Sequence, residues 1–489
     1  MRITNQMMVN STMANIQVNK KQVNTLETQL STQKKINKPS EDPVIAIRAL
    51  RLRSSLEQVT QYLNKNIPDA DSWLKTTEGA VDEAVSIITD LYAYCEQGAT
   101  DSYSPSERST LAESLNKLRD AYYAEGDVEY AGRYLFSGYM TDTPLTYQSD
   151  ETAAKADFTI TQEFTRENIE LKTVYTNAYS NDDILNLNVK TDAATGNVIT
   201  PNVADVHRVR IGYTKVSDAG TFEIKLNDGT TIAAAVNDSN YQPGDDEAAF
   251  NAATGEILLG ENVYKQLYAS DGFSFTYRKD NFAKGDLNPV MYYDCVDNNP
   301  DNAGVVYTKK TEDIEYNINF SQKLKVNTEA NEVFNMYLGR DIDDLITSVN
   351  NVIDIEAQLE KVEGMLKQDI YSDKDSQSKL NSIKEGLTKQ NELAKEEMKN
   401  RFEYCVGTMQ GYQEQASLAK ADAGNRMTRL NLTKSRLTEQ RTNFTNLKSE
   451  NEDIDLEEVV VGYSAAQLVY NASLTAASKV IQQTLLDFL

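Results

Sequence analysis

Apolar residues recur every seven positions at the start of this chain, and no other feature of the sequence restricts the fold as much. The stripe is Val9, Ile16, Val23 and Leu30, with Leu26 at the intervening d position, and neither glycine nor proline occurs before Pro39. A stripe this narrow is too thin for one face of a globular core, but it suits the seam of a coiled coil. We therefore expect residues 1–40 to form a helix that packs along another helix.

A second helix is expected to begin after the segment KPSEDPV, residues 38–44. Asp42 is a suitable N-cap, and Pro43 suits the first helical position, where its missing N–H costs nothing. Pro68 should kink this helix or restart it locally, without ending its apolar stripe. The stripe runs through Ile45, Ala49, Leu52, Leu56, Val59, Leu63, Ala70, Trp73, Ala80, Ala84, Ile87, Leu91 and Tyr94. Ser104 and Pro105 then begin a shorter helix.

The C-terminal third also has helical spacing. One stripe covers residues 345–366, and the segment KDSQSK near position 374 indicates a break. A longer rod follows, whose apolar residues are all seven apart: Phe402, Met409, Ala416, Ala423, Leu430, Leu437 and Phe444. After the acidic bend SENEDIDLEE, a final helix carries Val460, Leu474, Ile481, Leu485 and Phe488.

The middle of the chain alternates with a period of two residues, which indicates strands. Examples are HRVRIGYTKV, TFEIKLNDGTTIAA and GFSFTYRK, separated by Gly, Asn and Asp. The pair Asp228-Gly229 predicts a hairpin with a type I′ turn. We expect one or two antiparallel β modules here.

The fold class that follows is mainly α with a β insertion, in which long antiparallel helical rods or coiled coils come from both chain ends. Five segments are expected. They are a terminal helix (1–40), a helical rod (41–149), a β-rich outer region (150–327), a second rod (328–448) and a second terminal helix (449–489).

The two terminal segments differ in charge. Residues 1–40 hold six basic residues and one acidic residue, whereas residues 450–489 hold one basic and seven acidic. Opposite charges beside two apolar seams favour pairing of the N-terminal with the C-terminal helix. The alternative is two solvated helices whose charge is incidental.

Composition excludes several classes of function. The net charge of −25 disfavours nucleic acid as a partner, and no segment reaches the length of a membrane span. Three cysteines lie far apart, which favours small buried residues over disulfides or zinc ligands. His207 is the only histidine, so a histidine-dependent triad or zinc motif elsewhere is excluded. The start of the chain lacks the apolar core of a cleavable signal peptide.

Acidic groups in the chain could suggest chemistry. The pairs Asp343-Asp344, Glu396-Glu397 and Glu457-Glu458 lie in polar helix, where a solvated face is the expected state. The run DNNPDNAG, residues 297–304, lacks the spacing of a calcium loop and is expected to be a turn. We therefore expect no catalytic residue, no metal and no cofactor, and the chain is not expected to be an enzyme.

Four separated stretches carry a family resemblance. They are LSTQKKINKPSEDPVIAIRALRLRSSLEQ (30–58), GRYLFSGYMTDTPL (132–145), RLNLTKSRLTEQ (429–440) and LLDFL (485–489). In order and position they resemble the flagellin superfamily, and within it the hook-associated protein 3 family of the hook–filament junction. The motif residues are Ser40, Asp42, Pro43, Gly132, Arg133, Tyr134, Phe136 and Gly138. The chain departs from that family in the extra helical stretch near 360–400 and in Gln33, where a glycine is common.

The resemblance implies a structural subunit of the extracellular bacterial flagellum, exported unfolded through a type III channel without signal cleavage. Its implied partners are other copies of itself in a ring, the adjoining hook-associated junction protein, flagellin, and an export chaperone on the C-terminal segment. Neither nucleic acid nor membrane is implied. The assembly interface would include Val9, Ile16, Val23, Leu30, Val460, Leu474, Ile481, Leu485 and Phe488. Two alternatives remain open: a flagellin with a β-rich outer domain, and a subunit with an adhesive or glycan-binding insertion.

Overall fold

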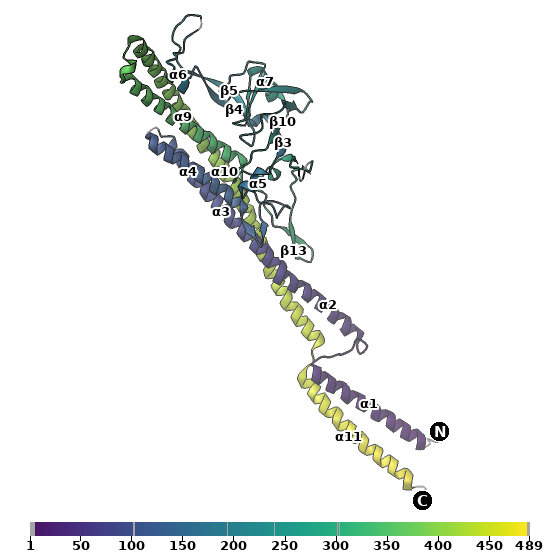
Figure 1. Cartoon of the computed structure of the whole chain (residues 1–489). Coiled ribbons are helices and arrows are strands. Elements are labelled where there is room, and N and C mark those ends of the chain that lie inside the picture. The colour runs from purple at the N-terminus through teal and green to yellow at the C-terminus, as the bar shows by residue number, and fades with distance from the viewer. Residues whose placement is uncertain are drawn as a thin grey trace. The chain divides into compact units, whose positions relative to one another are not determined.

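The computed structural model describes residues 5–486 except 101, 102, 193, 239, 301 and 303, with backbone alone for Asn5 and residues 480–486. It contains two compact units. The terminal unit comprises Met1–Ala70, Tyr316–Leu324 and Thr428–Leu489, and the central unit comprises Asp71–Glu315 and Lys325–Met427. Long helices come from both ends of the chain, and most strands come from its middle (Figure 1), which confirms the expected class, mainly α with a β insertion. The boundaries of the five expected segments stay a prediction.

The helices of the terminal unit are α1 (Asn5–Thr32), α2 (Pro43–Gln61), α11 (Leu456–Leu486) and the last part of α10 (Lys374–Glu452). Between α2 and α3 (Ile67–Gly98) the chain forms one π-helical turn, Tyr62–Asn66. Pro68 has no N–H to donate, and its ring clashes with the carbonyl four residues earlier in a regular α-helix. The wider turn accommodates this proline, and the chain stays helical without a new start, so the expected continuation of the apolar stripe is confirmed.

The central unit contains most of α3, together with α4 (Pro105–Ala124), α9 (Met336–Leu366) and the first part of α10. Ser104 begins α4 as expected, since its hydroxyl accepts from the Glu107 N–H in a capping box. Arg108 of α4 pairs with Glu356 of α9 at 2.9 Å. Trp73 and most of its stripe on α3 are buried.

The heptad stripe of α10 is confirmed. Six successive residues of the stripe have no exposed surface: Phe402, Met409, Ala416, Ala423, Leu430 and Leu437. Phe444, the next in the series, is half-buried. The expected break near 374 lies between α9 and α10, where Asp369–Tyr371 forms a short 3-10 turn.

Most strands of the central unit form one ten-stranded sheet, in the order β12-β11-β3-β10-β6-β7-β8-β9-β5-β4. Its strands are β3 (Phe158–Phe164), β4 (Ile169–Thr176), β5 (Asn202–Arg210), β6 (Phe222–Leu226), β7 (Thr231–Val236), β8 (Ala248–Asn251), β9 (Glu256–Leu259), β10 (Phe273–Lys279), β11 (Asp294–Asp297) and β12 (Val306–Tyr307). A small two-stranded sheet pairs β1 (Glu129–Tyr130) with β2 (Arg133–Tyr134). Another pairs β13 (Glu315–Asn319) with β14 (Gln322–Lys325), and most of it belongs to the terminal unit. The described residues also form the short helices α5 (Asp150–Ala154), α6 (Asn181–Leu185), α7 (Glu261–Ala269) and α8 (Ala330–Val333), together with short 3-10 turns.

Two expectations about the strands are wrong. The sheet is not wholly antiparallel, because β7 and β8 pair in parallel. The chain between them, residues 237–247, has about the ten to twelve residues that a crossover between parallel strands requires. The hairpin of β6 and β7 forms as expected, but only Gly229 of its turn has positive φ. A type I′ turn needs two such residues, so this is instead a tight turn followed by a left-handed glycine.

The extra helical stretch near 360–400 supports one edge of the sheet. Tyr175 of β4 donates its hydroxyl to Glu397 of α10, and the Tyr179 N–H donates to Gln390 Oε1 at 2.9 Å. Gly386 lies so close to Tyr179 that a Cβ atom there would stand 2.2 Å from the ring. This part of α10 therefore positions the edge strand β4.

Candidate assembly interface

The two terminal helices pack along each other as an antiparallel pair (Figure 1). The expected N-terminal stripe lies on the side of α1 that meets α11: Val9, Ile16, Val23, Leu26 and Leu30 are each half-buried. Asn19 is also half-buried, and its Nδ2 donates to Ser473 Oγ at 2.6 Å. A single polar contact inside an apolar seam fixes the register of two helices.

The residues of α11 on the partly buried face differ from those expected. They follow steps of four and three: Val459, Tyr463, Ala466, Tyr470, Ser473 and Ala477. Val460 and Leu474 lie beside this row and remain 44% and 43% exposed. Ile481, Leu485 and Phe488 lie outside the residues whose side chains the structure describes. Sequence reasoning missed the row because apolar and small residues occur on every side of α11, so spacing alone does not select one.

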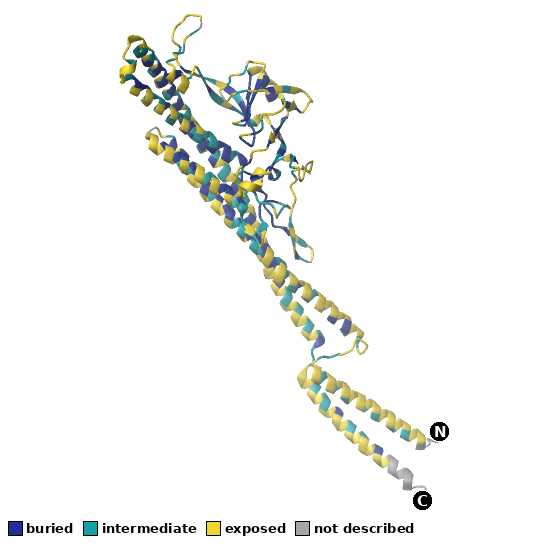
Figure 2. Cartoon of the chain, viewed as in Figure 1, coloured by how far each residue is buried: buried dark blue, intermediate teal, exposed yellow. Residues whose placement is uncertain are grey.

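The remaining surface of α11 is uncharged, and exposed apolar residues alternate on it with exposed polar ones such as Gln467 and Asn471. No charged residue occurs from Val459 to Ser478. Leu468 and Val461 are 72% and 70% exposed, and Val469 is exposed as well. Figure 2 shows most of α1 and α11 as exposed. A helix with apolar residues on all sides is normally enclosed by other helices or by lipid. Among the described residues, however, no helix is both long and apolar enough to cross a membrane.

The motif KPSEDP builds the turn before α2. The Glu41 N–H donates to the Lys38 carbonyl at 3.0 Å, which places Pro39 and Ser40 at the corners of a turn. Asp42 is the N-cap and accepts from the N–H groups of Val44 and Ile45, with Pro43 in the first turn of the helix. Both local predictions are therefore confirmed, whereas a role of these residues between subunits remains untested.

Gln33 ends α1 in a left-handed conformation, with φ of 57°. Glycine adopts this conformation without strain, which explains physically why a glycine suits the position. Beside it the two chain ends meet: Lys34 and Asp453 form an antiparallel bridge and an ion pair. Glu452 is 3% exposed and accepts two hydrogen bonds from Arg53, both of 2.7 Å.

The expected charge complementarity between the chain ends is concentrated at this crossing. Acidic residues of the C-terminal segment, Glu452 and Asp453, pair with Lys34 of the N-terminal segment. Arg53, which also binds Glu452, lies in α2, beyond the expected segment 1–40. Farther along α1, Lys20 and Lys21 make no ion pair with the described residues of the chain.

The second motif, GRYLFSG, forms a compact turn region in the central unit. Ala131 and Gly132 both have positive φ, at 52° and 74°, as the tight hairpin of β1 and β2 requires. The Arg133 guanidinium lies 4.8 Å from the centre of the Trp73 ring. Phe136 is buried edge-on against Phe334, with 4.9 Å between ring centres. The motif thus joins α3 to the segment that begins α9. Tyr134 and Gly138 lie in the same region, Gly138 with φ of 61°.

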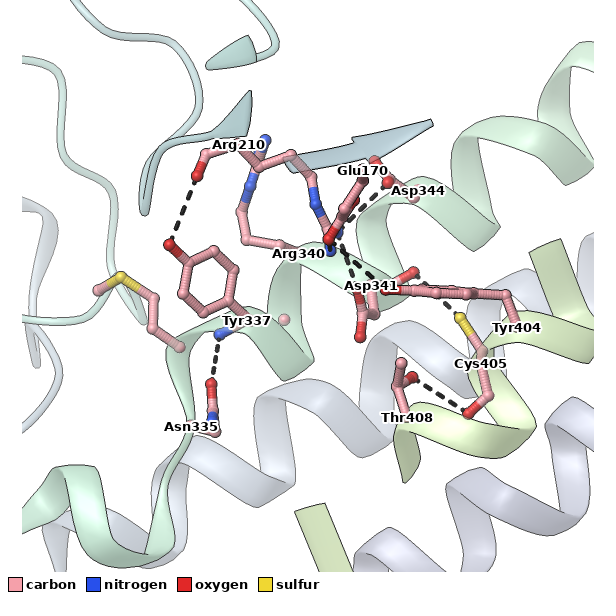
Figure 3. Close-up of polar contacts among 12 residues, drawn as sticks. Glu170, Arg210, Asn335, Tyr337, Arg340, Asp341, Asp344, Tyr404, Cys405 and Thr408 are labelled. Carbon is pink, nitrogen blue, oxygen red and sulfur yellow. Dashed lines mark hydrogen bonds and ion pairs between the residues drawn. The ribbon is translucent and has the colours of Figure 1, made fainter. Parts of the chain in front are cut away.

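A buried charge network fastens the sheet to α9 (Figure 3). Arg210 of β5 pairs with Glu170 at 2.7 Å and with Asp341 at 2.8 Å. Arg208 pairs with Asp344 at 2.6 Å. Burial opposes ionisation of Asp344, but the nearby guanidinium groups of Arg208 and Arg210 outweigh it and lower its pKa. The expectation of a solvated face is therefore wrong for Asp344, because arginines from a distant strand cover it. The Asp343 side chain stays 38% exposed and pairs with Arg119.

A small cavity of about 160 Å³ lies beside this network. Its wall includes Arg210 and Glu170, which already pair with each other, and Tyr412, whose hydroxyl donates to Asp341 at 2.8 Å. These partners favour a packing role for the wall. Within the described residues no cluster of three or more His, Cys, Asp or Glu side chains could hold a metal ion. The three cysteines are buried and unpaired, as expected.

Among known proteins, the N-terminal helical part of the chain matches a described family. Residues 3–141 match the family described as the bacterial flagellin N-terminal helical region. Flagellar hook-associated protein 3 of Salmonella typhimurium is 28% identical over 144 residues, which are 29% of this chain and 45% of that protein. A flagellin of Clostridium tyrobutyricum is 26% identical over 120 residues, 24% of this chain and 32% of that protein.

This chain therefore matches less than half the length of either relative. A solved structure of a putative flagellar hook-associated protein from Vibrio parahaemolyticus covers 84% of this chain and all of its own, with a TM-score of 0.37 at 11% identity. That likeness is too low to support an argument about the fold. The match of the first 141 residues and the similarity to hook-associated protein 3 nevertheless confirm the resemblance to the flagellin superfamily that the sequence motifs indicated.

Proposed function

We propose that this chain is a structural subunit of the bacterial flagellum that joins the hook region to the flagellin filament. Its terminal helices assemble with those of neighbouring copies in a ring, between the adjoining hook-associated protein and flagellin. It is exported without a cleaved signal peptide, with a chaperone on its C-terminal segment. Its role is structural and involves no catalysis. The alternative that it is a flagellin is supported by the match to the flagellin N-terminal region and by one flagellin that is 26% identical over 120 residues, a shorter match than that to hook-associated protein 3.

The surface of α11 is the observation that carries this proposal. One row of its residues, from Val459 to Ala477, meets α1, while Val461, Leu468 and Val469 on its other sides stay exposed. Exposed apolar residues on all free sides of a helix are costly in water unless other helices cover them. In the assembly, helices of neighbouring copies would cover them.

The exposed apolar residues of α1 extend the same surface. Met7, Met8, Met13 and Val18 lie outside the seam with α11 and remain exposed. Because both helices of the pair carry uncovered apolar residues, the pair can pack against others of its kind on more than one side. The predicted interface residues Val460 and Leu474 belong to this uncovered surface, whereas Val9, Ile16, Val23 and Leu30 contribute first to the pair itself.

The experiment is the substitution Leu468→Asp in cells that depend on this chain for motility. A carboxylate at an exposed position should leave the melting temperature of the isolated chain unchanged. If neighbouring helices enclose this position, the same carboxylate would be desolvated without a partner. It would then weaken the free energy of assembly by several kcal/mol per subunit. We expect the variant to be exported but lost from the hook tip, and flagellin to appear in the medium.

Leu171→Asp is the matched control, since Leu171 is likewise exposed but lies on the sheet. It should leave filaments intact. Normal filaments on cells with Leu468→Asp would refute assembly through α11. A large fall in the melting temperature of that variant would mean that Leu468 packs within its own chain.

A further inference from the structure

Two connecting segments of the terminal unit lie side by side: the one that follows α1 and the one that follows α10. There the Lys35 N–H donates to the Glu452 carbonyl at 2.7 Å, and the Ile454 N–H donates to the Gln33 carbonyl at 3.3 Å. With the bridge between Lys34 and Asp453, these bonds form a very short antiparallel ribbon. Two connecting segments that could each move independently are thus held together by backbone hydrogen bonds.

One buried carboxylate secures this ribbon from the side. Glu452 is 3% exposed, and both of its oxygens accept from Arg53, one from Nε and one from Nη2. Lys34 Nζ lies 3.6 Å from the same carboxylate. A carboxylate removed from water is tolerated only with such partners. Both of its cationic partners come from the N-terminal part of the chain, so this burial requires both chain ends.

Further hydrogen bonds extend the contact to three helices. Asn451 Nδ2 donates to the Ile45 carbonyl at 3.1 Å, which ties the end of α10 to the start of α2. Lys35 Nζ donates to the Glu450 carbonyl at 2.5 Å, and Gln29 Nε2 donates to the Lys35 carbonyl at 2.7 Å. The end of α1 is therefore joined through Lys35 to the end of α10.

We propose that residues 33–35 and 450–454 form a latch, closed by the pairing of Glu452 with Arg53. The latch docks α1 and α11 onto α2 and α10 only when both chain ends are folded together. A partner that holds the C-terminal segment in another conformation would leave the latch open and the N-terminal connection accessible. This inference concerns the single chain in solution, so it does not depend on the assembly proposed above.

The test measures trypsin cleavage after Lys34 and Lys35, which lie inside the latch. Glu452→Gln keeps the shape of the side chain but removes its charge. Loss of two charge-assisted hydrogen bonds should raise the open population, and with it the cleavage rate at these sites, about tenfold or more. Arg53→Gln should do the same, and the double variant should be cleaved no faster than either single one.

Glu450→Gln is the matched control: it removes an equal charge from an exposed side chain two residues earlier, and it leaves in place the Glu450 backbone carbonyl that accepts from Lys35. It should leave cleavage after Lys34 and Lys35 unchanged. Trp73 is buried in the central unit and is the only tryptophan, so its emission reports whether that unit stays folded. Equal cleavage of the Glu452→Gln and Glu450→Gln variants would overturn the latch. So would additive effects in the double variant, or faster cleavage accompanied by a red shift of Trp73 emission, because the effect would then not be local.

Discussion

Gly98 and Phe402 provide a quantitative test of how α3 packs on α10 in the central unit. Phe402 has no exposed surface, and a Cβ atom at position 98 would stand 2.2 Å from its ring. In Phe402→Ala the lost ring should cost about 3–5 kcal/mol of unfolding free energy. In Gly98→Ala the added methyl group must displace the buried ring, which should cost about 1–3 kcal/mol.

The two changes should not be additive. Once Phe402 is alanine, the methyl group of Gly98→Ala enters space that the ring has left, so the second change should be neutral or stabilising. Gly79→Ala is the control on the same helix, because no heavy atom lies within 4 Å of a Cβ there. Gly79→Ala should raise the unfolding free energy of the central unit by up to about 1 kcal/mol, because alanine is more favourable than glycine in a helix interior. Urea unfolding followed by Trp73 fluorescence measures all four variants. An equal cost of Gly98→Ala with and without the ring would refute the close packing.

Three further predictions concern the terminal unit, each read by amide hydrogen exchange. Ser473→Ala leaves Asn19 half-buried without its partner, so exchange in α1 should quicken by an amount equivalent to about 1 kcal/mol, while exchange in α4 stays constant. Gln33→Gly should slow exchange at the end of α1, because a left-handed conformation costs a residue with a side chain about 1 kcal/mol; Gln33→Ala should not slow it. Hydrogen bonds from Arg53, together with the charge of Lys34, lower the pKa of Glu452 below its ordinary value of 4.5. The latch is therefore most stable above that pH, and protection of the Lys35 amide should fall as the pH drops below it, a dependence that Glu452→Gln should weaken.

Features set by local spacing were predictable from the sequence. The stripe from Phe402 to Leu437 could be identified because no competing apolar row interrupts it, and every member is buried. Asp42 and Ser104 could be identified as caps because each places a side-chain oxygen directly before a proline that begins a helix, where it can accept from the free N–H groups of the first turn. Even Gln33 was recognisable as unusual, although its positive φ needed the structure.

Features set by distant partners were not predictable. Asp344 seemed to lie on a solvated helix face, and only the course of β5 brings Arg208 and Arg210 to it. On α11, residues such as Ala466 and Ala477 give no stronger signal than their exposed neighbours, so the row against α1 could not be chosen from spacing. The parallel pairing of β7 with β8 depends on the path of the connecting residues 237–247. The alternation of apolar and polar residues within a strand does not determine that path.

Immunogold labelling of flagella tests most directly the proposal that the chain joins hook to filament. Antibodies against the isolated central unit, bound to flagella and seen by immunogold electron microscopy, would locate it. A subunit of the junction should give a single narrow band of label where the hook meets the filament. Label along the whole filament would contradict it and would instead identify the chain as a filament subunit.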